Sequence, residues 1–210
     1  AGRIAEPAAT SRSRSEVLRG FEEEGKLAFI ESDVNDADHL RLAVESCLEA
    51  RQITVNVVVH CAGRASDVGY DAEFRRTNYQ SVITLAQLSK TLEAERFVFV
   101  STVDVYGLKD FEKGTEETLD YDEEAKNPYP KYKIAAEKWI KDNLALEKFS
   151  IVRPAQVWGV GDKTLTPRFV DFMKWSPFII HFGSWRGANR WPLAHVKNVA
   201  TAVFLASTLE

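Results

Sequence analysis

Cysteine, excess positive charge and long apolar runs are all scarce in this sequence of 210 residues. Two cysteines, Cys47 and Cys61, are too few for a disulfide framework and lack the spacing of metal ligands, which favours a reducing compartment and no bound metal. Lys and Arg number 27 against 31 Asp and Glu, whereas a general nucleic-acid binder carries a basic surplus. No stretch approaches the roughly 20 apolar residues of a membrane span. We therefore expect a cytoplasmic protein with no nucleic-acid partner and no membrane span.

The sequence does contain an alternation of short apolar runs, rich in β-branched residues, with longer amphipathic stretches. This alternation is typical of α/β units built on a parallel sheet. The run VNVVVH (55–60) predicts a fully buried strand, and apolar side chains at three- and four-residue spacing predict a helix over 73–92. The other expected strands are 27–30, 96–101 and 149–153, and the other expected helices are 36–50, 129–143, 167–175 and 195–207.

The residues with the most specific chemistry are Tyr129 and Lys133, at the start of an expected helix. Side chains four residues apart lie on the same helix face. There an ammonium can lower the pKa of a phenol from about 10 toward neutrality, so that the phenol exchanges a proton with a substrate hydroxyl or carbonyl. Thr102, at the carboxyl end of an expected strand, lies where an open α/β sheet places its ligand-facing groups. Alone, a Tyr and a Lys at this spacing also fit an ordinary surface pair.

Several segments, in order along the chain, resemble the extended short-chain dehydrogenase/reductase family. This family includes NAD(P)-dependent sugar-nucleotide epimerases and dehydratases and the 3β-hydroxysteroid dehydrogenases. FVFVSTVDVYG (97–107) is similar to the strand that carries the active-site hydroxyl, and NPYPKYKIAAEKW (127–139) to the catalytic Tyr-xxx-Lys helix. VVVHCAG (57–63) is similar to the strand and turn beside the adenosine half of the cofactor. The other similar segments are FRRTNYQSV (74–82), IVRPAQVWGVGD (151–162) and PLAHVKNVATAVFLA (192–206).

The resemblance implies a Rossmann-like doubly wound parallel sheet and hydride transfer between a substrate carbon and the nicotinamide of NAD(P). It assigns Tyr129 as the acid/base, Lys133 as the residue that lowers the phenol pKa and holds the nicotinamide ribose, and Thr102 as the residue that orients the substrate oxygen. Asn78 supports the active site. Tyr132 is excluded as the catalytic tyrosine, because an alanine stands four residues after it. The residues implied for cofactor binding are Arg12, Asp33, Val34, Cys61, Ala62, Gly63, Lys133 and Pro154.

Arg12 bears on the choice between NAD and NADP. AATSRS (8–13) resembles the end of the family's second strand, where a basic residue commonly meets the 2′-phosphate of NADP. The resemblance therefore gives a slight preference for NADP, with a flexible basic terminus as the alternative. Asp33 is implied as the acceptor for the adenine amine, with Val34 beside the ring. The alternative for Asp33 is a helix N-cap or a turn residue.

The glycine-rich turn that opens this fold, Gly-xx-Gly-xx-Gly, has no counterpart here, since only Gly2, Gly20 and Gly25 precede the first expected strand. Without the strand before that turn, the expected sheet has a gap of about 9.6 Å, unless residues 1–12 move into it. We expect a sequence that is incomplete at its N-terminus and includes only part of the substrate region. The expected divisions are a Rossmann-like core (1–160), a partial substrate region (161–194) and a helix that returns to the core (195–210).

The sequence thus predicts an NAD(P)-dependent oxidoreductase or epimerase/dehydratase. The alternative is a degenerate, non-catalytic member of the family that acts as a sensor or a structural subunit. Two substrate classes stay open, a sugar nucleotide and a hydrophobic alcohol or ketone, and a homodimer is compatible with either. The arginines that favour the first class are Arg168, Arg186 and Arg190, and the tryptophans that favour the second are Trp158, Trp175, Trp185 and Trp191.

Overall fold

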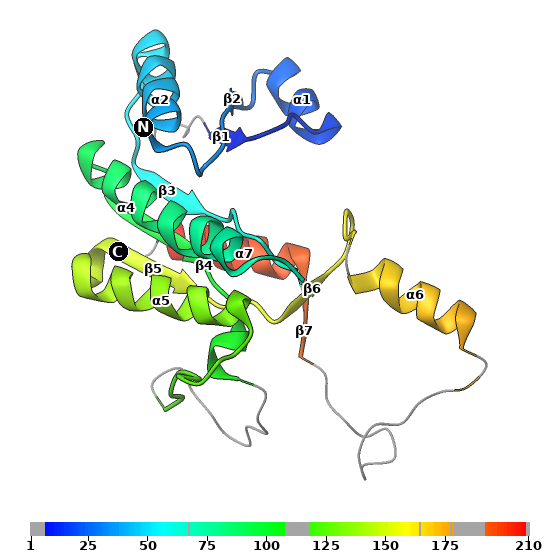
Figure 1. Cartoon of the computed structure of the whole chain (residues 1–210). Coiled ribbons are helices and arrows are strands. Elements are labelled where there is room, and N and C mark those ends of the chain that lie inside the picture. Colours follow the sequence, from blue (N-terminus) through cyan, green and yellow to red (C-terminus); the bar gives the residue numbers. More distant parts are fainter. Residues whose placement is uncertain are drawn as a thin grey trace.

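The strands of the computed structural model are parallel and lie in an α/β arrangement of the Rossmann type (Figure 1). The structure describes residues 7–66, 68–107, 118–163, 165–176, 178 and 192–208. One sheet pairs β1 (Ala8–Ser11) with β2 (Ala28–Glu31), and a second sheet has the order β3 (Val57–His60), β4 (Arg96–Val100), β5 (Phe149–Val152). A third, short pair joins β6 (Gln156–Trp158) to β7 (Leu193–His195). The predicted fold class is confirmed, although α1, β6 and β7 have no counterpart among the elements expected from periodicity.

Helices connect the strands and cover both faces of the three-stranded sheet. In Figure 1, α4 and α5 lie in front of this sheet and α7 lies behind it. Among the described residues, no helix combines the length and the apolar character needed to cross a membrane. The helices are α1 (Glu16–Glu23), α2 (Ala37–Arg51), α3 (Asp71–Arg75), α4 (Ser81–Thr91), α5 (Pro128–Asn143), α6 (Leu165–Trp175) and α7 (Val196–Thr208), with the short helices η1 (Arg76–Gln80), η2 (Val103–Tyr106) and η3 (Leu146–Lys148).

The main core forms where α4 and α5 pack on β4. Phe97 and Phe99 alternate with Val98 along β4, so that the two rings point to the same face of the strand. Their rings are buried against Val82 of α4 and Ile140 of α5. Burial of each such side chain contributes about 1.5–3 kcal/mol, so this contact fixes α5 relative to the carboxyl end of β4. The candidate catalytic residues lie at that junction.

The expected helix over 73–92 is divided into three parts. α3 ends at Arg75, a single π-helical turn follows as η1, and α4 begins at Ser81. A π-turn inserts one extra residue into a helix and often occurs at functional sites. Periodicity does not reveal it, because the apolar spacing on either side of the turn still fits a helix. Its consequence is that the side chain of Asn78 is fully buried.

The sheet carries the gap that the sequence predicts. In the strand order 3-2-1-4-5-6, β2 and β1 correspond to the third and second strands, and β3, β4 and β5 to the fourth, fifth and sixth. Among the described residues, β1 and β3 form no ladder with each other. Residues 8–11 pair with β2 instead of moving beside β3. Val59 on the edge strand β3 is accordingly 40% exposed.

His60, at the end of β3, is a buried histidine whose environment makes the stability pH-dependent. Its Nε2 lies 3.1 Å from the Ser81 hydroxyl, which donates its own hydrogen to the Thr77 carbonyl at 2.6 Å. His60 Nε2 therefore donates to Ser81, and the ring is neutral. Burial, together with the nearby Lys133 ammonium, lowers the His60 pKa to about 3.

Because the folded-state pKa of His60 lies below the unfolded value of 6.5, unfolding takes up a proton between about pH 6.5 and pH 3. This contribution to stability is complete above pH 6.5 and is lost as the pH falls through that range, by about 1.4 kcal/mol per pH unit.

The variant His60→Gln carries a side chain that does not titrate. We predict that its unfolding free energy falls less between pH 6.5 and 4.5 than that of the wild type, with a difference of about 3 kcal/mol over that interval. Urea denaturation at each pH measures this, and His39→Gln, which replaces an exposed histidine, is the matched control. Equal slopes for His60→Gln and wild type would contradict the prediction.

Candidate active site

A cavity of about 410 Å³ lies beyond the carboxyl ends of the three-stranded sheet, where open α/β sheets bind their ligands. It brings Thr102, Tyr129 and Lys133 together. The segments that follow β3, β4 and β5 and the first turns of α5 and α6 form its walls. The lining residues are Cys61, Gly63, Ala65, Ser66, Val100, Ser101, Thr102, Asp104, Asn127, Tyr129, Lys133, Pro154, Ala155, Gln156, Val157, Leu165 and Arg168.

Two helix starts position Thr102 and Tyr129. Thr102 is the N-cap of η2, and its hydroxyl accepts a hydrogen bond of 3.2 Å from the Asp104 amide. Asn127 caps α5 and accepts from the Tyr129 amide at 2.9 Å, while Pro128 fixes the first helical residue. These caps bring the Thr102 hydroxyl near enough to the Tyr129 phenol to lower the phenol's pKa. The two groups are arranged to hold one substrate oxygen between them.

The pKa of Tyr129 differs from the sequence expectation. Burial raises the phenol pKa, the hydrogen bond with Thr102 lowers it in part, and the Asp104 carboxylate raises it further. The predicted lowering by Lys133 is absent from this arrangement, because the Lys133 ammonium donates to the Val100 carbonyl at 2.8 Å rather than to the phenol. The phenol is therefore protonated at neutral pH. In this state it can donate a proton to a substrate oxygen.

Lys133 is 3% exposed, and its ammonium lies at the carboxyl end of β4, beside the turn after β3. Its ammonium lies 4.6 Å from the centre of the Phe99 ring. Burial lowers its pKa to about 8, against the opposing effects of Cys61 and Glu137. A lysine with this pKa is mostly charged at neutral pH, and the cost of its burial is offset only in part.

Asn78 and Gly63 complete the wall behind Lys133. Asn78 accepts from the Arg64 amide at 2.7 Å and donates to the Arg64 carbonyl at 3.1 Å, so it fixes the turn after β3. A Cβ on Gly63 would lie 3.3 Å from Asn78 Oδ1 and 3.4 Å from Lys133 Nζ. The glycine therefore leaves room that a larger residue would fill, directly beside the Lys133 ammonium. Ala62 lies between Cys61 and Gly63 in the same turn, outside the lining of the cavity.

Arg12, Asp33 and Val34, implied for the adenosine half, follow the strands of the two-stranded sheet and do not line this cavity. Cys61 and Gly63, in the turn that the resemblance also places beside the adenosine half, do line it. Arg12 follows β1 and is exposed, whereas Arg14 pairs with Glu22 at 3.1 Å. Asp33 follows β2, and its carboxylate accepts from the backbone and side-chain nitrogens of Asn35 at 2.9 Å each. This is a turn contact, while Asp36 is the cap of α2.

Side-chain hydrogen bonds connect the two-stranded sheet to the candidate active site. The Asn35 side chain donates to the Thr77 hydroxyl at 3.4 Å, and the Arg76 side chain donates to the Asn35 carbonyl at 3.4 Å. Val34 packs at the edge of the main core. The loop after β2 is thereby attached to η1, the turn that carries Asn78.

Sequence reasoning missed three polar residues of the cavity, Ser101, Asp104 and Gln156, whereas Arg168, which it named in favour of a sugar nucleotide, does line the cavity. Ser101 and Asp104 flank Thr102, and Gln156 follows the strand β5 by four residues, so the rule that ligand-facing groups follow strand ends could have found them. Ser101 Oγ is buried and has no hydrogen-bond partner among the described residues. Such a hydroxyl is available to a bound molecule.

The tryptophans that suggested a hydrophobic substrate do not form one cluster in the described part of the chain. Trp158 packs edge-on against His195, with ring centres 4.8 Å apart, and so supports β6 and β7. Trp175 is 89% exposed at the end of α6. Trp185 and Trp191, like Arg186 and Arg190, lie outside the described residues.

A model of the family described as NAD dependent epimerase/dehydratase matches residues 6–209 of the chain. The chain belongs to this family. Human dTDP-D-glucose 4,6-dehydratase is 25% identical over 156 residues, which cover 70% of this chain and 41% of the human protein. The chain thus spans about two fifths of the length of this curated relative.

Solved structures of the family share the fold. The UDP-N-acetylglucosamine 4-epimerase of Methanobrevibacter ruminantium, solved with UDP-N-acetylmuramic acid, has a TM-score of 0.73 at 20% identity and covers 96% of this chain and 65% of its own. The dTDP-glucose 4,6-dehydratase of Bacillus anthracis, solved with NAD, has a TM-score of 0.66 at 21% identity, with 91% and 58% covered. These likenesses confirm the expected fold, and the family model confirms the expected family.

Proposed function

We propose that this chain carries the catalytic cavity of an NAD(P)-dependent epimerase or dehydratase in which Tyr129 is the acid/base. The observation that supports this most directly is that Thr102, Tyr129 and Lys133 line one cavity, with the Thr102 hydroxyl near enough to the Tyr129 phenol to lower its pKa. Family membership gives the expectation of a nicotinamide cofactor. Two points stay predictions: the division of the chain into core, substrate region and returning helix, and the homodimer.

The residues around Lys133 fit the nicotinamide end of such a cofactor. A Cβ at residue 63 would narrow the space that Gly63 leaves beside Lys133. The buried Ser101 hydroxyl lacks a hydrogen-bond partner among the described residues. Lys133 would hold the ribose hydroxyls, with Cys61, Gly63 and Pro154 as the surrounding wall. When bound, the nicotinamide supplies or accepts the hydride at the substrate carbon.

Proton transfer in this proposal is the work of Tyr129. Thr102 holds the substrate oxygen beside the phenol, and the protonated phenol donates its hydrogen as a carbonyl becomes a hydroxyl. In the reverse direction the phenolate accepts the hydroxyl proton, and a Lys133 ammonium turned toward the phenol would favour that anion. Asp104 lines the same cavity and offers a second polar side chain to the substrate.

A sugar nucleotide is the substrate class that the lining of the cavity favours. Asp104, Asn127 and Gln156 present hydrogen-bonding groups suited to sugar hydroxyls, and Arg168 offers charge to a diphosphate. The M. ruminantium relative was solved with a UDP-sugar derivative. A hydrophobic alcohol has less support, because the tryptophans that suggested it are either packed on His195, exposed, or outside the described residues.

The role of Tyr129 is tested by replacing it and, separately, Tyr132. Tyr129→Phe removes the proton that is transferred, so turnover of UDP- and dTDP-hexoses should fall by about 100-fold or more. Tyr132→Phe is the matched control: its phenol donates to Asp71 between α5 and α3 and should leave turnover near the wild-type value. Chromatography of the sugar products measures both variants. Wild-type turnover in Tyr129→Phe would overturn the role of Tyr129, whereas no turnover in the wild type itself would favour the non-catalytic sensor or structural subunit.

Arg12 supports a preference for NADP, because its exposed guanidinium follows β1 and is suited to the 2′-phosphate. Arg12→Ala should weaken NADPH binding about tenfold, the value of one charge-assisted hydrogen bond, and leave NADH binding unchanged. Arg19→Ala removes an exposed arginine from α1 and is the control. Nicotinamide fluorescence measures both affinities. Equal loss for NADH and NADPH would contradict the preference, and binding of neither cofactor to the wild type would contradict the proposed function.

A further inference from the structure

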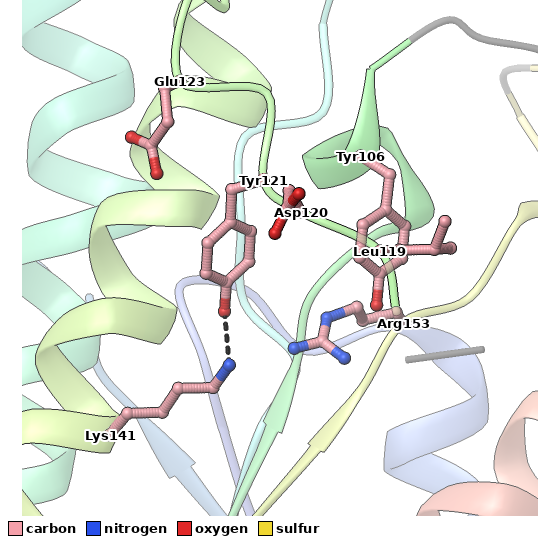
Figure 2. A pocket seen from close by; sticks show the side chains of 7 residues that line it. All are labelled: Tyr106, Leu119, Asp120, Tyr121, Glu123, Lys141 and Arg153. Carbon is pink, nitrogen blue, oxygen red and sulfur yellow. Dashed lines mark hydrogen bonds between the residues drawn. The ribbon is translucent and has the colours of Figure 1, made fainter. Parts of the chain in front are cut away.

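A second cavity, of about 330 Å³, is built partly from the same segments as the candidate active site. Its lining residues, drawn in Figure 2, are Tyr106, Leu119, Asp120, Tyr121, Glu123, Lys141 and Arg153. Tyr106 belongs to η2, Lys141 to α5, and Arg153 follows β5 directly. η2, α5 and the segment after β5 therefore each contribute one residue here and others to the candidate active site.

The residue that lies between the two sites along α5 is Glu137. It follows Lys133 by four residues and precedes Lys141 by four, so all three side chains lie on one face of the helix. Glu137 is 0% exposed, and Lys133 is 3% exposed. A buried carboxylate therefore stands one helical turn from the buried ammonium.

Side chains of the second cavity hold the Glu137 carboxylate in place. Arg153 Nε lies 3.0 Å from each carboxylate oxygen, and Arg153 Nη2 donates to Oε2 at 2.5 Å. The Tyr121 hydroxyl also donates to Oε2, at 2.7 Å. Lys141 Nζ in turn donates to the Tyr121 hydroxyl at 2.7 Å, the dashed contact in Figure 2. Among the described residues, the groups that hydrogen-bond to the carboxylate are donors, so its position is fixed.

Lys133 has no such close partner. No carboxylate in the described part of the chain lies within ion-pair distance of its ammonium, which donates to a backbone carbonyl and faces the Phe99 ring. The titratable groups around it are Cys61 and His60 at the end of β3, and Tyr129 and Glu137 on its own helix. Of these, Glu137 is the carboxyl group, and the donors that contact it, Arg153 and Tyr121, are those suited to a carboxylate.

We propose that Glu137 is a positioning residue of the candidate active site, a fixed counter-charge that keeps the buried Lys133 side chain in its ammonium form. The second cavity contributes indirectly, because Arg153 holds the carboxylate on the helix face that it shares with Lys133. This inference rests on the proposed role of Lys133 in catalysis. The charge balance itself exists without cofactor or substrate, and it can be measured without them.

The direct test follows the titration of Lys133 by NMR in protein labelled with ¹³C at the lysine ε-carbon, with Lys133→Arg to assign the signal. The wild-type midpoint is expected near pH 8, the value to which burial lowers the Lys133 pKa. In Glu137→Gln the midpoint should fall by about one pH unit or more. Glu123→Gln is the matched control, since it removes an exposed carboxylate of the same cavity that pairs with Lys138 at 2.6 Å. Its midpoint should stay at the wild-type value.

Two further variants separate charge from packing. Glu137→Gln leaves the buried Arg153 unpaired and can unfold the chain, so the double variant Glu137→Gln/Arg153→Gln removes both charges and keeps two amides in contact. Its midpoint should also fall, because Arg153 faces the Tyr106 ring, 5.5 Å away, rather than Lys133. Tyr121→Phe keeps the carboxylate charge and should lower the melting temperature without moving the midpoint.

A midpoint that stays near pH 8 in the double variant, or in a folded Glu137→Gln protein, would overturn the proposal. An equal shift in Tyr121→Phe would overturn it as well, since packing and not charge would then control Lys133. Because neither cofactor nor substrate is present, a failure of the proposed catalytic function leaves this result unaffected.

Discussion

The site is organised around one costly feature, the burial of the Lys133 ammonium. Its pKa of about 8, against an ordinary value of 10.5, corresponds to about 3 kcal/mol lost by keeping the charge in the folded protein at neutral pH. A hydrogen bond to Val100, the face of the Phe99 ring and the carboxylate of Glu137 offset part of that cost. Proteins retain destabilising charges of this kind mainly at sites that use them.

The fold brings the required groups to this charge by simple means. Parallel strands deliver the ends of β3 and β4 to one edge of the sheet, and the buried rings of β4 fix α5 against that edge. Helix caps at Thr102 and Asn127 then aim a hydroxyl and a phenol into the same cavity. The π-turn η1 buries Asn78, whose amide fixes the turn beside Gly63. Each of these devices is local, while the site they form is assembled from segments far apart in sequence.

Much of this arrangement could be read from the residues. Apolar alternation predicts the parallel strands, and the ordered similarity of several segments predicts both the family and the meeting of Thr102, Tyr129 and Lys133 in one cavity. The direction of the Tyr129 pKa could not be predicted, because four-residue spacing places Lys133 on the right face without deciding where its flexible side chain points. The π-turn and the partners of Glu137 were also hidden, since they depend on contacts between segments that periodicity treats separately.

The central claim is that Lys133 is kept buried and charged because its function requires this, although the buried charge lowers the stability of the folded protein. The measurement that tests it most directly compares the melting temperature and the nicotinamide fluorescence response of Lys133→Met with those of the wild type at pH 7. The account predicts a higher melting temperature in the variant and loss of the fluorescence response, because a side chain of similar length then fills the same space without charge. The gain should shrink as the pH rises from about 8 toward 10.5, where the wild-type lysine loses its proton. A lower melting temperature together with an unchanged fluorescence response would contradict the account.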